Sequence, residues 1–339
     1  MAYIVSSSEK LQKSANDAET KALLYLMSFR EDSDEIHYFI IDFLNDVTGM
    51  NKKANKLWDL QSKGAKESYP KEVGRELVTL YKNYISDFEF SCYILFLGGV
   101  SQSFRKDSSI NNFGIGNISG EAILRLKEGL KDECSKKKYI DDSKVDDDSI
   151  EEFLKKVYFV IESKDKSEYV RNIIKTNSNI IPNDEVLIGI FNEIKKVQSS
   201  KKSLNVVEGI KLEELDEIPN YGRHLTSTEI KMLVLNRLIN QEVMTANITP
   251  SFINIYNTFP EGEKGNMLED CQLNLSAALF NVNYKKEFWE LFEDIYNNVL
   301  MNPKDTVDQI YRKLNDTILE FDIIALKYFI ALIKDGMEK

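Results

Sequence analysis

One short segment of the sequence places an acid, an amide and an amine at alternate positions. Residues 56–63, KLWDLQSK, alternate in character and are predicted to form a strand, which puts Asp59, Gln61 and Lys63 on one face. The preceding hydrophobic strand ends at Asp46. If the two strands pair as a hairpin, Asp46 lies beside Gln61. Because a lysine and a carboxylate are costly to bury unless they pair, this grouping indicates a functional site or, with equal weight, a structural ion pair.

The composition restricts the chemistry that the chain can perform. Its 339 residues include only two histidines and three cysteines, and the cysteines are far apart with no C-x-x-C pair. These counts argue against a histidine-rich zinc site, a zinc ribbon and a redox-active cysteine pair, and they fit a reducing compartment. Chemistry must therefore be sought in carboxylates, lysines, amides or hydroxyls.

Charge is distributed unevenly along the chain. The formal net charge of −11 argues against a protein that coats nucleic acid over its whole surface. Residues 51–82 nevertheless contain eight basic and four acidic side chains, so this window is net positive. We expect it to face a partner that carries phosphate groups, and a solvated lysine-rich loop and helix face is the alternative.

Up to about residue 225, the hydrophobic pattern predicts helices and strands in one layered domain. Residues 45–55 contain Gly49 and several asparagines and are expected to form a turn. The whole order predicts an α/β fold, a mixed sheet flanked by helices. Helices are expected at residues 14–30, 70–84, 119–134 and 183–197, and strands at residues 36–44, 56–63, 88–97 and 157–162.

After residue 225 the pattern predicts helices alone. Thr226 and Glu229 match a T-x-x-E capping box, and long amphipathic helices are expected at residues 285–301 and 304–333. We therefore predict two domains, residues 1–225 and 226–339, of which the second is all-helical. The N-terminus lacks the pattern of a signal peptide, and the most apolar run is too short for a bilayer. We expect a cytoplasmic protein that does not contact a membrane.

The predicted element order around these residues resembles the core of the PD-(D/E)xK nucleases. NDVTGM at residues 45–50, followed by LWDLQSKGAK at residues 57–66, is similar to the D-x(n)-QxK variant of that core. This variant is found in the CD-NTase-associated double-stranded DNA endonuclease domain family, which also supplies the nuclease subunit of Lamassu-type antiphage complexes. The resemblance covers roughly residues 10–225 and implies a restriction-endonuclease-like fold.

The resemblance implies a role for each matched residue. Asp46 would ligate Mg²⁺, or Mn²⁺ in its place, and Gln61 would contribute its side-chain oxygen as a further metal ligand. Lys63 would orient the attacking water and stabilise the charge that develops on the scissile phosphate. Glu19 on the first helix is expected to assist, and Asp17 is its competitor.

Two further acids lie close to these positions in the sequence. Asp59 shares the predicted face of Gln61 and is expected either to supply the charge that a neutral Gln61 lacks at the metal site or to be a solvated strand-end acid. Asp42 has the same strand parity as Asp46. We prefer Asp46 because it stands at the strand end next to a turn, where sites usually form.

The activity that the resemblance implies is Mg²⁺-dependent cleavage of double-stranded DNA by an effector of a bacterial antiphage system. About 115 residues follow the nuclease-like region, too few for the sensing domain of standalone members. We therefore expect gating by homo-oligomerisation or by partner subunits such as an SMC-like ATPase. Two alternatives stay open: a catalytically degenerate adaptor of the same fold, in which Gln61 marks the loss of metal binding, and an RNA-cleaving toxin.

Overall fold

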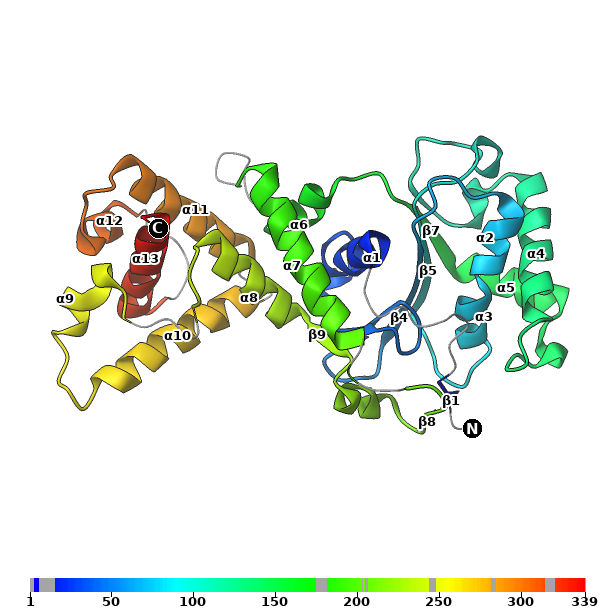
Figure 1. The fold of residues 1–339 in the computed structure, drawn as a ribbon, viewed down its shortest axis with the longest axis horizontal. Helices are drawn as coiled ribbons and strands as arrows, with labels where there is room; N and C mark the ends of the chain where they lie inside the picture. Colours follow the sequence, from blue (N-terminus) through cyan, green and yellow to red (C-terminus); the bar gives the residue numbers. More distant parts are fainter. Residues whose placement is uncertain are drawn as a thin grey trace. The chain divides into compact units, whose positions relative to one another are not determined.

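The chain divides into two compact units, which we call the sheet unit and the helical unit. The computed structural model describes residues 3–5, 16–174, 182–202, 204, 207–243, 248–281, 285–314 and 321–338. The sheet unit combines residues 1–169 with 191–227, and the helical unit combines residues 170–190 with 228–339 (Figure 1). A functional division of the chain at residue 225 stays a prediction.

A mixed sheet forms the centre of the sheet unit, with its seven described strands in the order β6-β7-β5-β4-β3-β2-β9. Three consecutive strands form an antiparallel meander, and the next two run parallel to the last of them. The short edge strands β6 and β9 are antiparallel to their neighbours. The strands are β2 (Ile36–Ile41), β3 (Val47–Asn51), β4 (Leu57–Lys63), β5 (Cys92–Leu97), β6 (Asn112–Phe113), β7 (Val157–Ile161) and β9 (His224–Thr226).

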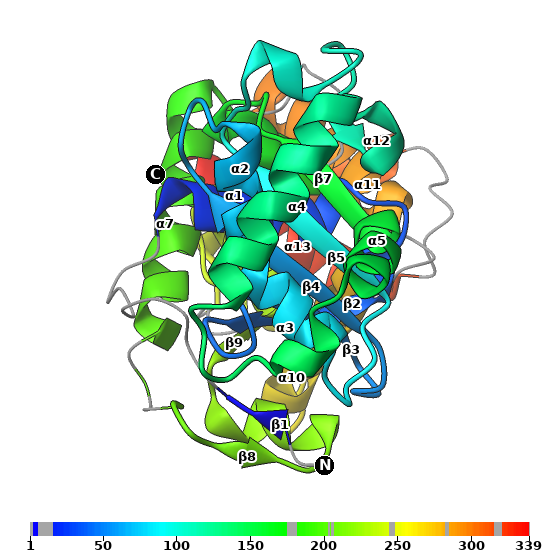
Figure 2. The same ribbon diagram turned by 90° about the vertical axis from the view of Figure 1, so that its right-hand side faces the viewer.

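Helices cover both faces of this sheet, so the predicted fold class is confirmed at this level. Helix α1 (Asp17–Ser28) lies on one face, and residues 191–202 of α7 (Asp184–Lys202) pack against it (Figure 1). The other face is covered by α2 (Pro70–Glu76), α3 (Val78–Tyr84), α4 (Gly120–Cys134) and α5 (Asp147–Lys156), which lie in front of the strands in Figure 2. Short elements complete the described chain: strands β1 (Tyr3–Ile4) and β8 (Lys211–Leu212), helix α6 (Lys166–Ile174), and 3₁₀ turns at Ser33–Glu35, Gln102–Phe104, Ile115–Asn117, Asp142–Lys144, Leu215–Tyr221 and Pro250–Phe252.

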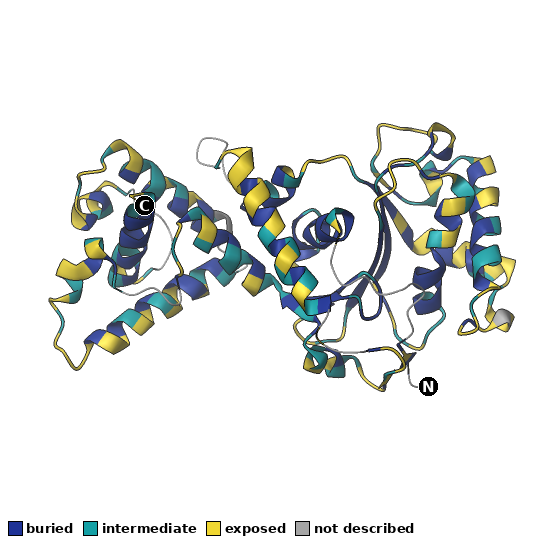
Figure 3. Cartoon of the chain, viewed as in Figure 1, coloured by how far each residue is buried: buried dark blue, intermediate teal, exposed yellow. Residues whose placement is uncertain are grey.

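Burial follows from this layering. Strands β4 and β5 are covered on both faces, so nearly all of their residues are buried (Figure 3). Helices α2 and α4 approach each other closely at two glycines. A Cβ atom on Gly74 would lie 2.1 Å from the carbonyl oxygen of Leu126, and one on Gly129 would lie 2.0 Å from that of Lys71. A side chain at either glycine would therefore force the two helices apart.

Several element boundaries differ from the prediction. Residues 45–55 are not simply a turn, because Val47–Asn51 form strand β3 between β2 and β4. Gly49 suits this strand, since a Cβ atom there would lie 3.1 Å from the Ile36 side chain. The predicted strand at residues 36–44 ends at Ile41 because Asp42 has a positive φ of 51°. The helix that starts at Pro70, as predicted, is interrupted at Leu77.

The helical unit is built around its last helix, α13 (Ile323–Met337). Residues 328–333 of α13 are all buried, and α10 (Lys264–Phe280), α11 (Lys285–Met301) and α12 (Val307–Lys313) pack around it (Figure 3). Helices α8 (Ser227–Leu238) and α9 (Ile253–Tyr256) complete the described part of the unit. The prediction of a helical C-terminal region is confirmed, and α11 has its predicted bounds.

The single long helix predicted at residues 304–333 is wrong. Thr306 caps α12, which ends at Lys313, and Leu314 has extended backbone angles. A second cap at Asp322, whose carboxylate accepts hydrogen bonds from the amides of Ile324 and Ala325, begins α13. Residues 315–320 of the predicted helix lie outside the described residues. Within the described part of the chain, no helix has the length and apolar character needed to cross a bilayer.

Candidate functional site

Asp46 directly precedes β3, beside the C-terminal part of β4. The antiparallel register pairs Val47 with Leu60, so Asp46, one residue before β3, comes beside Gln61. One carboxylate oxygen of Asp46, Oδ2, accepts three hydrogen bonds: from Gln61 Nε2 at 3.1 Å, from the Ser62 amide at 2.8 Å and from Ser62 Oγ at 2.9 Å. The expected proximity of Asp46 and Gln61 is therefore observed. It arises from pairing of β3 with β4, and not from a hairpin of β2 and β4.

The electrostatic surroundings of Asp46 disfavour its negative charge. Burial, together with the nearby Glu19 carboxylate, raises the pKa of Asp46 to about 7, although the hydrogen bonds from Ser62 and the charge of Lys63 act in the opposite direction. An acid in this state gains stability when a cation approaches, because the cation offsets both the desolvation and the repulsion from Glu19.

Lys63 stands two residues beyond Gln61 and projects from the same side of β4. Its ammonium forms an ion pair with Glu76 at the end of α2, with an N–O distance of 3.0 Å. Because its charge also lowers the pKa of Asp46, the ammonium acts electrostatically on that carboxylate. The structure thus brings the Lys63 charge near Asp46 but gives it a carboxylate partner of its own.

Glu19 approaches from the first turn of α1. Its backbone amide donates to the Asn16 side chain, which caps the helix, and Asn16 Nδ2 donates back to Glu19 Oε1 at 3.0 Å. The other carboxylate oxygen accepts from Lys202 Nζ at 2.6 Å, and both side chains of this pair are buried. Burial raises the pKa of Glu19 in spite of the bond from Lys202, and Asp42 raises it further.

The competitor Asp17 has different partners. Its carboxylate pairs with Lys166 at 2.6 Å and with Lys195 at 2.7 Å, and these hydrogen bonds hold its pKa below the usual range although partial burial acts against them. Glu19, by contrast, acts electrostatically on Asp46. Because both lysine partners of Asp17 come from α6 and α7 and not from the strands that carry Asp46 and Gln61, we favour Glu19 over Asp17 as the helix residue of the site.

Asp42 lies in a buried charge network next to Glu19. Its Oδ2 is 3.5 Å from an Arg223 nitrogen and 4.0 Å from Lys202 Nζ. The same Arg223 nitrogen donates to the backbone carbonyl of Lys202 at 2.8 Å. Residues from three elements far apart in the sequence thus lie together next to Glu19: the end of β2, the end of α7 and the start of β9.

Asp59 is not the solvated strand-end acid that we considered, because its side chain is fully buried. Asn45 and Asn83 donate to its two oxygens at 2.9 and 2.7 Å. Burial raises the pKa of Asp59 to about 7, while these amides and Lys82 lower it. The side-chain oxygen of Asn45 in turn accepts from the Asp46 amide at 2.9 Å. A direct metal-ligand role for Asp59 stays a prediction, but its observed contacts connect it to Asp46 through Asn45.

The basic window at residues 51–82 is more balanced in the structure than in the sequence. Three of its lysines pair with carboxylates from elsewhere in the sheet unit or from α2, at distances of 2.5–3.0 Å: Lys56, Lys63 and Lys71. Lys82 is buried, with its ammonium 4.6 Å from the centre of the Tyr3 ring. Lys52, Lys53, Lys66 and Arg75 are exposed. The exposed members, and not the whole window, are the positions open to a phosphate-bearing partner.

The donor types at the site fit a hard divalent cation. Mg²⁺ prefers oxygen ligands and retains several waters, so one or two carboxylates and an amide oxygen suffice. The convergence of the Asp46 carboxylate with the Gln61 side chain, near the Glu19 carboxylate, supports such a fit. Among the described residues no group of three or more acidic, histidine or cysteine side chains gathers as a metal site, so a ligand set built on carboxylates alone is not present.

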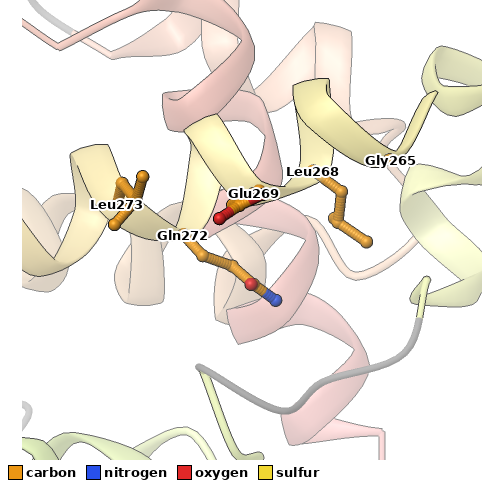
Figure 4. Close-up of a pocket in the computed structure, with 5 residues that line it drawn as sticks. All are labelled: Gly265, Leu268, Glu269, Gln272 and Leu273. Atoms are coloured by element: carbon orange, nitrogen blue, oxygen red, sulfur yellow. The ribbon is translucent and has the colours of Figure 1, made fainter. Parts of the chain in front are cut away.

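A surface hollow of about 340 Å³ lies elsewhere, along α10 in the helical unit (Figure 4). Its lining is Gly265, Leu268, Glu269, Gln272 and Leu273. It includes none of the residues discussed above, and its one ionisable side chain offers no acid–base pair.

Sequence reasoning missed four participants. Ser62 donates to Asp46 through its amide and its hydroxyl, and no pattern in the sequence assigned it this role. Asn45, Lys202 and Arg223 were not singled out. Adjacency to Asp46 was a usable signal for Asn45. No local pattern distinguishes Lys202, which ends a lysine-rich helix about 180 residues from Glu19.

No protein-family model matches the chain, and neither the curated proteins nor the solved structures compared with it include a match.

Proposed function

We propose that the chain is a Mg²⁺-dependent DNA endonuclease with Asp46, Gln61 and Lys63 as its reactive residues and Glu19 as their helper. The observation that carries the proposal is the convergence of Gln61 and Ser62 on one carboxylate oxygen of Asp46, beside the charge of Lys63. Such a partly buried acid with a perturbed pKa, next to an amide and an amine, is more typical of a functional site than of a structural ion pair.

The arrangement of elements supports a restriction-endonuclease-like fold within the proposal. Helix α1 precedes an antiparallel meander of β2, β3 and β4, and helices then lead to β5, which is parallel to β4. The resemblance implies a helix, a strand that ends in Asp, a strand with Q-x-K, and then a helix and a strand. The structure has this order with one additional strand, β3, so Asp46 directly precedes β3 and does not end the first strand.

Each residue has a chemical task in this proposal. Asp46, as a carboxylate, binds the cation, and Ser62 fixes its orientation. The Gln61 amide donates to Asp46 through its nitrogen, so its oxygen is the atom available as a neutral ligand. Lys63 places a positive charge near the scissile phosphate, where it stabilises the negative charge that develops in the transition state. A bound Mg²⁺ supplies Lewis-acid polarisation of the phosphate and of a water molecule.

The test is cleavage of plasmid DNA in the presence of Mg²⁺ by the wild type and by the variants Asp46→Ala and Lys63→Ala. We expect each variant to lose at least about 100-fold in rate, the loss typical of removing a group that stabilises transition-state charge. Lys56→Ala is the matched control, since Lys56 precedes the same strand and pairs with Glu35 at 2.7 Å. Equal cleavage by all four proteins would refute the assignment of the site.

A catalytically degenerate adaptor is the second candidate, and a specific observation favours it. Lys63 is paired with Glu76, Glu19 is paired with Lys202, and Gln61 is neutral. An adaptor predicts no cleavage of DNA or RNA under any activating condition, together with no stabilisation of the chain by Mg²⁺. Cleavage of RNA but not of DNA would identify the toxin alternative in the same assay.

We also propose that the nuclease is an antiphage effector whose activity is gated by self-association or by a partner such as an SMC-like ATPase. The helical unit has exposed apolar side chains at which a docking role can be tested, for example Leu273, Leu300 and Met301, which are 54%, 61% and 77% exposed. The cleavage assay tests this proposal when the protein concentration is varied. Full activity of the dilute, isolated chain would contradict gating.

A further inference from the structure

The ammonium of Lys202 is a buried cation held between acids. It lies 2.6 Å from Glu19 Oε2 and 4.0 Å from Asp42 Oδ2, and its side chain is only 4% exposed. Burying a lysine is costly unless carboxylates surround it, so this position is one where the fold itself favours a positive charge. The acids that create it come from α1 and from the end of β2, next to Asp46.

The same acids face the candidate metal site. Glu19 acts electrostatically on Asp46, and Asp42 donates its backbone amide to the Asp46 carbonyl at 3.1 Å. A divalent ion bound at Asp46 would therefore also be attracted to Glu19. The Glu19 carboxylate cannot hold Lys202 Nζ at 2.6 Å and serve as a metal ligand with the same oxygen.

The helix that carries Lys202 also holds α1 at two other points. Lys195 donates to Asp17 at 2.7 Å, and Gln198 accepts from the Thr20 hydroxyl at 2.8 Å. Residues 184–190 of this helix belong to the helical unit and residues 191–202 to the sheet unit. The Lys202–Glu19 pair therefore has a direct covalent connection to the helical unit through α7.

We propose that Lys202 is a built-in competitor of the divalent ion: its ammonium occupies Oε2 of Glu19, and metal binding through that oxygen requires this ion pair to open. The inference rests on the proposed metal site at Asp46. It assigns α7 the role of holding that site in a state of low metal affinity.

The experiment measures Mn²⁺ binding to the full chain without nucleic acid, by titration calorimetry and by the electron paramagnetic resonance of free Mn²⁺. Lys202→Met removes the ammonium and keeps most of the side-chain volume, and we expect it to bind Mn²⁺ at least about tenfold more tightly than the wild type. Lys195→Met, which removes the exposed pair with Asp17 from the same helix, is the control and should leave the affinity unchanged. Adding Glu19→Gln to Lys202→Met should abolish the gain.

A second measurement uses the wild type alone, in case Lys202→Met does not fold. Acetylation of Lys202, followed by mass spectrometry, should be slow without metal and become several-fold faster at saturating Mn²⁺, with Lys195 as the internal reference. A folded Lys202→Met with wild-type affinity, or an unchanged acetylation rate of Lys202, would overturn the inference.

These outcomes are separable from those that test the nuclease. Tighter Mn²⁺ binding by Lys202→Met without cleavage of any nucleic acid would support the inference and contradict the proposed activity. DNA cleavage that depends on Asp46, combined with an unchanged Mn²⁺ affinity in Lys202→Met, would support the activity and overturn the inference.

Discussion

The buried carboxyl of Asp59 contributes to the pH dependence of the stability of the sheet unit, and Asp59→Asn should remove that contribution. Asp59 is fully buried, and its pKa is raised from 3.8 to about 7, chiefly by burial. Because the folded state keeps the proton at pH values where the unfolded state has released it, folding stability falls as pH rises between these two values. The loss begins near the unfolded pKa and is complete above the folded one.

The size of the effect follows from the two pKa values. Linkage between 3.8 and about 7 gives a loss of wild-type stability of roughly 2–3 kcal/mol between pH 5 and pH 7.5 from this group. Asparagine has the same shape but does not titrate. It presents an NH₂ group to one of the two amides that now donate to Asp59, so the variant also carries a penalty of about 1–3 kcal/mol that is independent of pH. The pH-dependent difference is therefore the diagnostic quantity.

Urea unfolding at pH 5, 6, 7 and 7.5 measures this difference. The chain has two tryptophans, so Trp289→Phe leaves Trp58 as the single reporter for the sheet unit. Burial lowers the pKa of Lys82 to about 8, so the series ends at pH 7.5, where Lys82 is still mostly charged. We expect the stability of Asp59→Asn relative to its parent to rise by roughly 2–3 kcal/mol across the range. A relative stability that does not change with pH would refute the reasoning about Asp59.

Two further predictions concern packing and the site. Gly336→Ala should destabilise the helical unit by about 1–3 kcal/mol, since the new Cβ would lie 1.7 Å from the Ile239 carbonyl oxygen. The control is Gly262→Ala, whose Cβ would meet no atom within 4 Å. Thermal melts followed by Trp289 fluorescence compare the two variants. Equal melting temperatures for the two variants would contradict this contact. Ser62→Ala removes a hydroxyl donor from Asp46, so the pKa of Asp46 should rise by about one unit from its value of about 7. A ¹³C NMR titration of the Asp46 carboxyl group measures this pKa. A value below that of the wild type would contradict the assigned hydrogen bond.

The elements that could be predicted are those with local signals. Pro70 begins α2, Ser119 caps α4, and the β-branched and aromatic run at residues 157–161 forms β7. Each has a start signal or a periodic apolar pattern within its own length. Strand β3 lacks such a signal, because VTGMN is short and contains glycine, and its conformation depends on pairing with β2 and β4 on either side. Tertiary pairing overrode local propensity there.

The interruption of the C-terminal helix illustrates a different limit. Apolar residues recur at helical spacing across residues 304–333, so periodicity alone favoured one helix. Helices α12 and α13 instead each begin at a cap of their own, Thr306 and Asp322, which are single polar residues within that apolar pattern.

For the site, alternation along β4 identified which residues share a face but not how deeply each one is buried. Asp59, Gln61 and Lys63 share a face as predicted, yet Asp59 is fully buried and contacts Asn83 of α3, while Lys63 is 20% exposed. The partners of Glu19 could not be predicted at all. Lys202 and Arg223 lie about 180 residues from the acids that they contact, and only the folded chain brings them together.

The charge pattern leads to a similar conclusion about function. The sequence shows a net positive window in an acidic chain, and this suggests a surface for phosphate groups. In the structure three of its eight basic side chains, Lys56, Lys63 and Lys71, are already paired with acids at distances of 2.5–3.0 Å. A phosphate would have to replace those acids, at little cost where the pair is exposed and at more cost where it is buried. The proposed nucleic-acid substrate therefore depends less on the window than on Asp46 and Lys63, where a carboxyl group with a raised pKa lies near the charge of a partly exposed lysine.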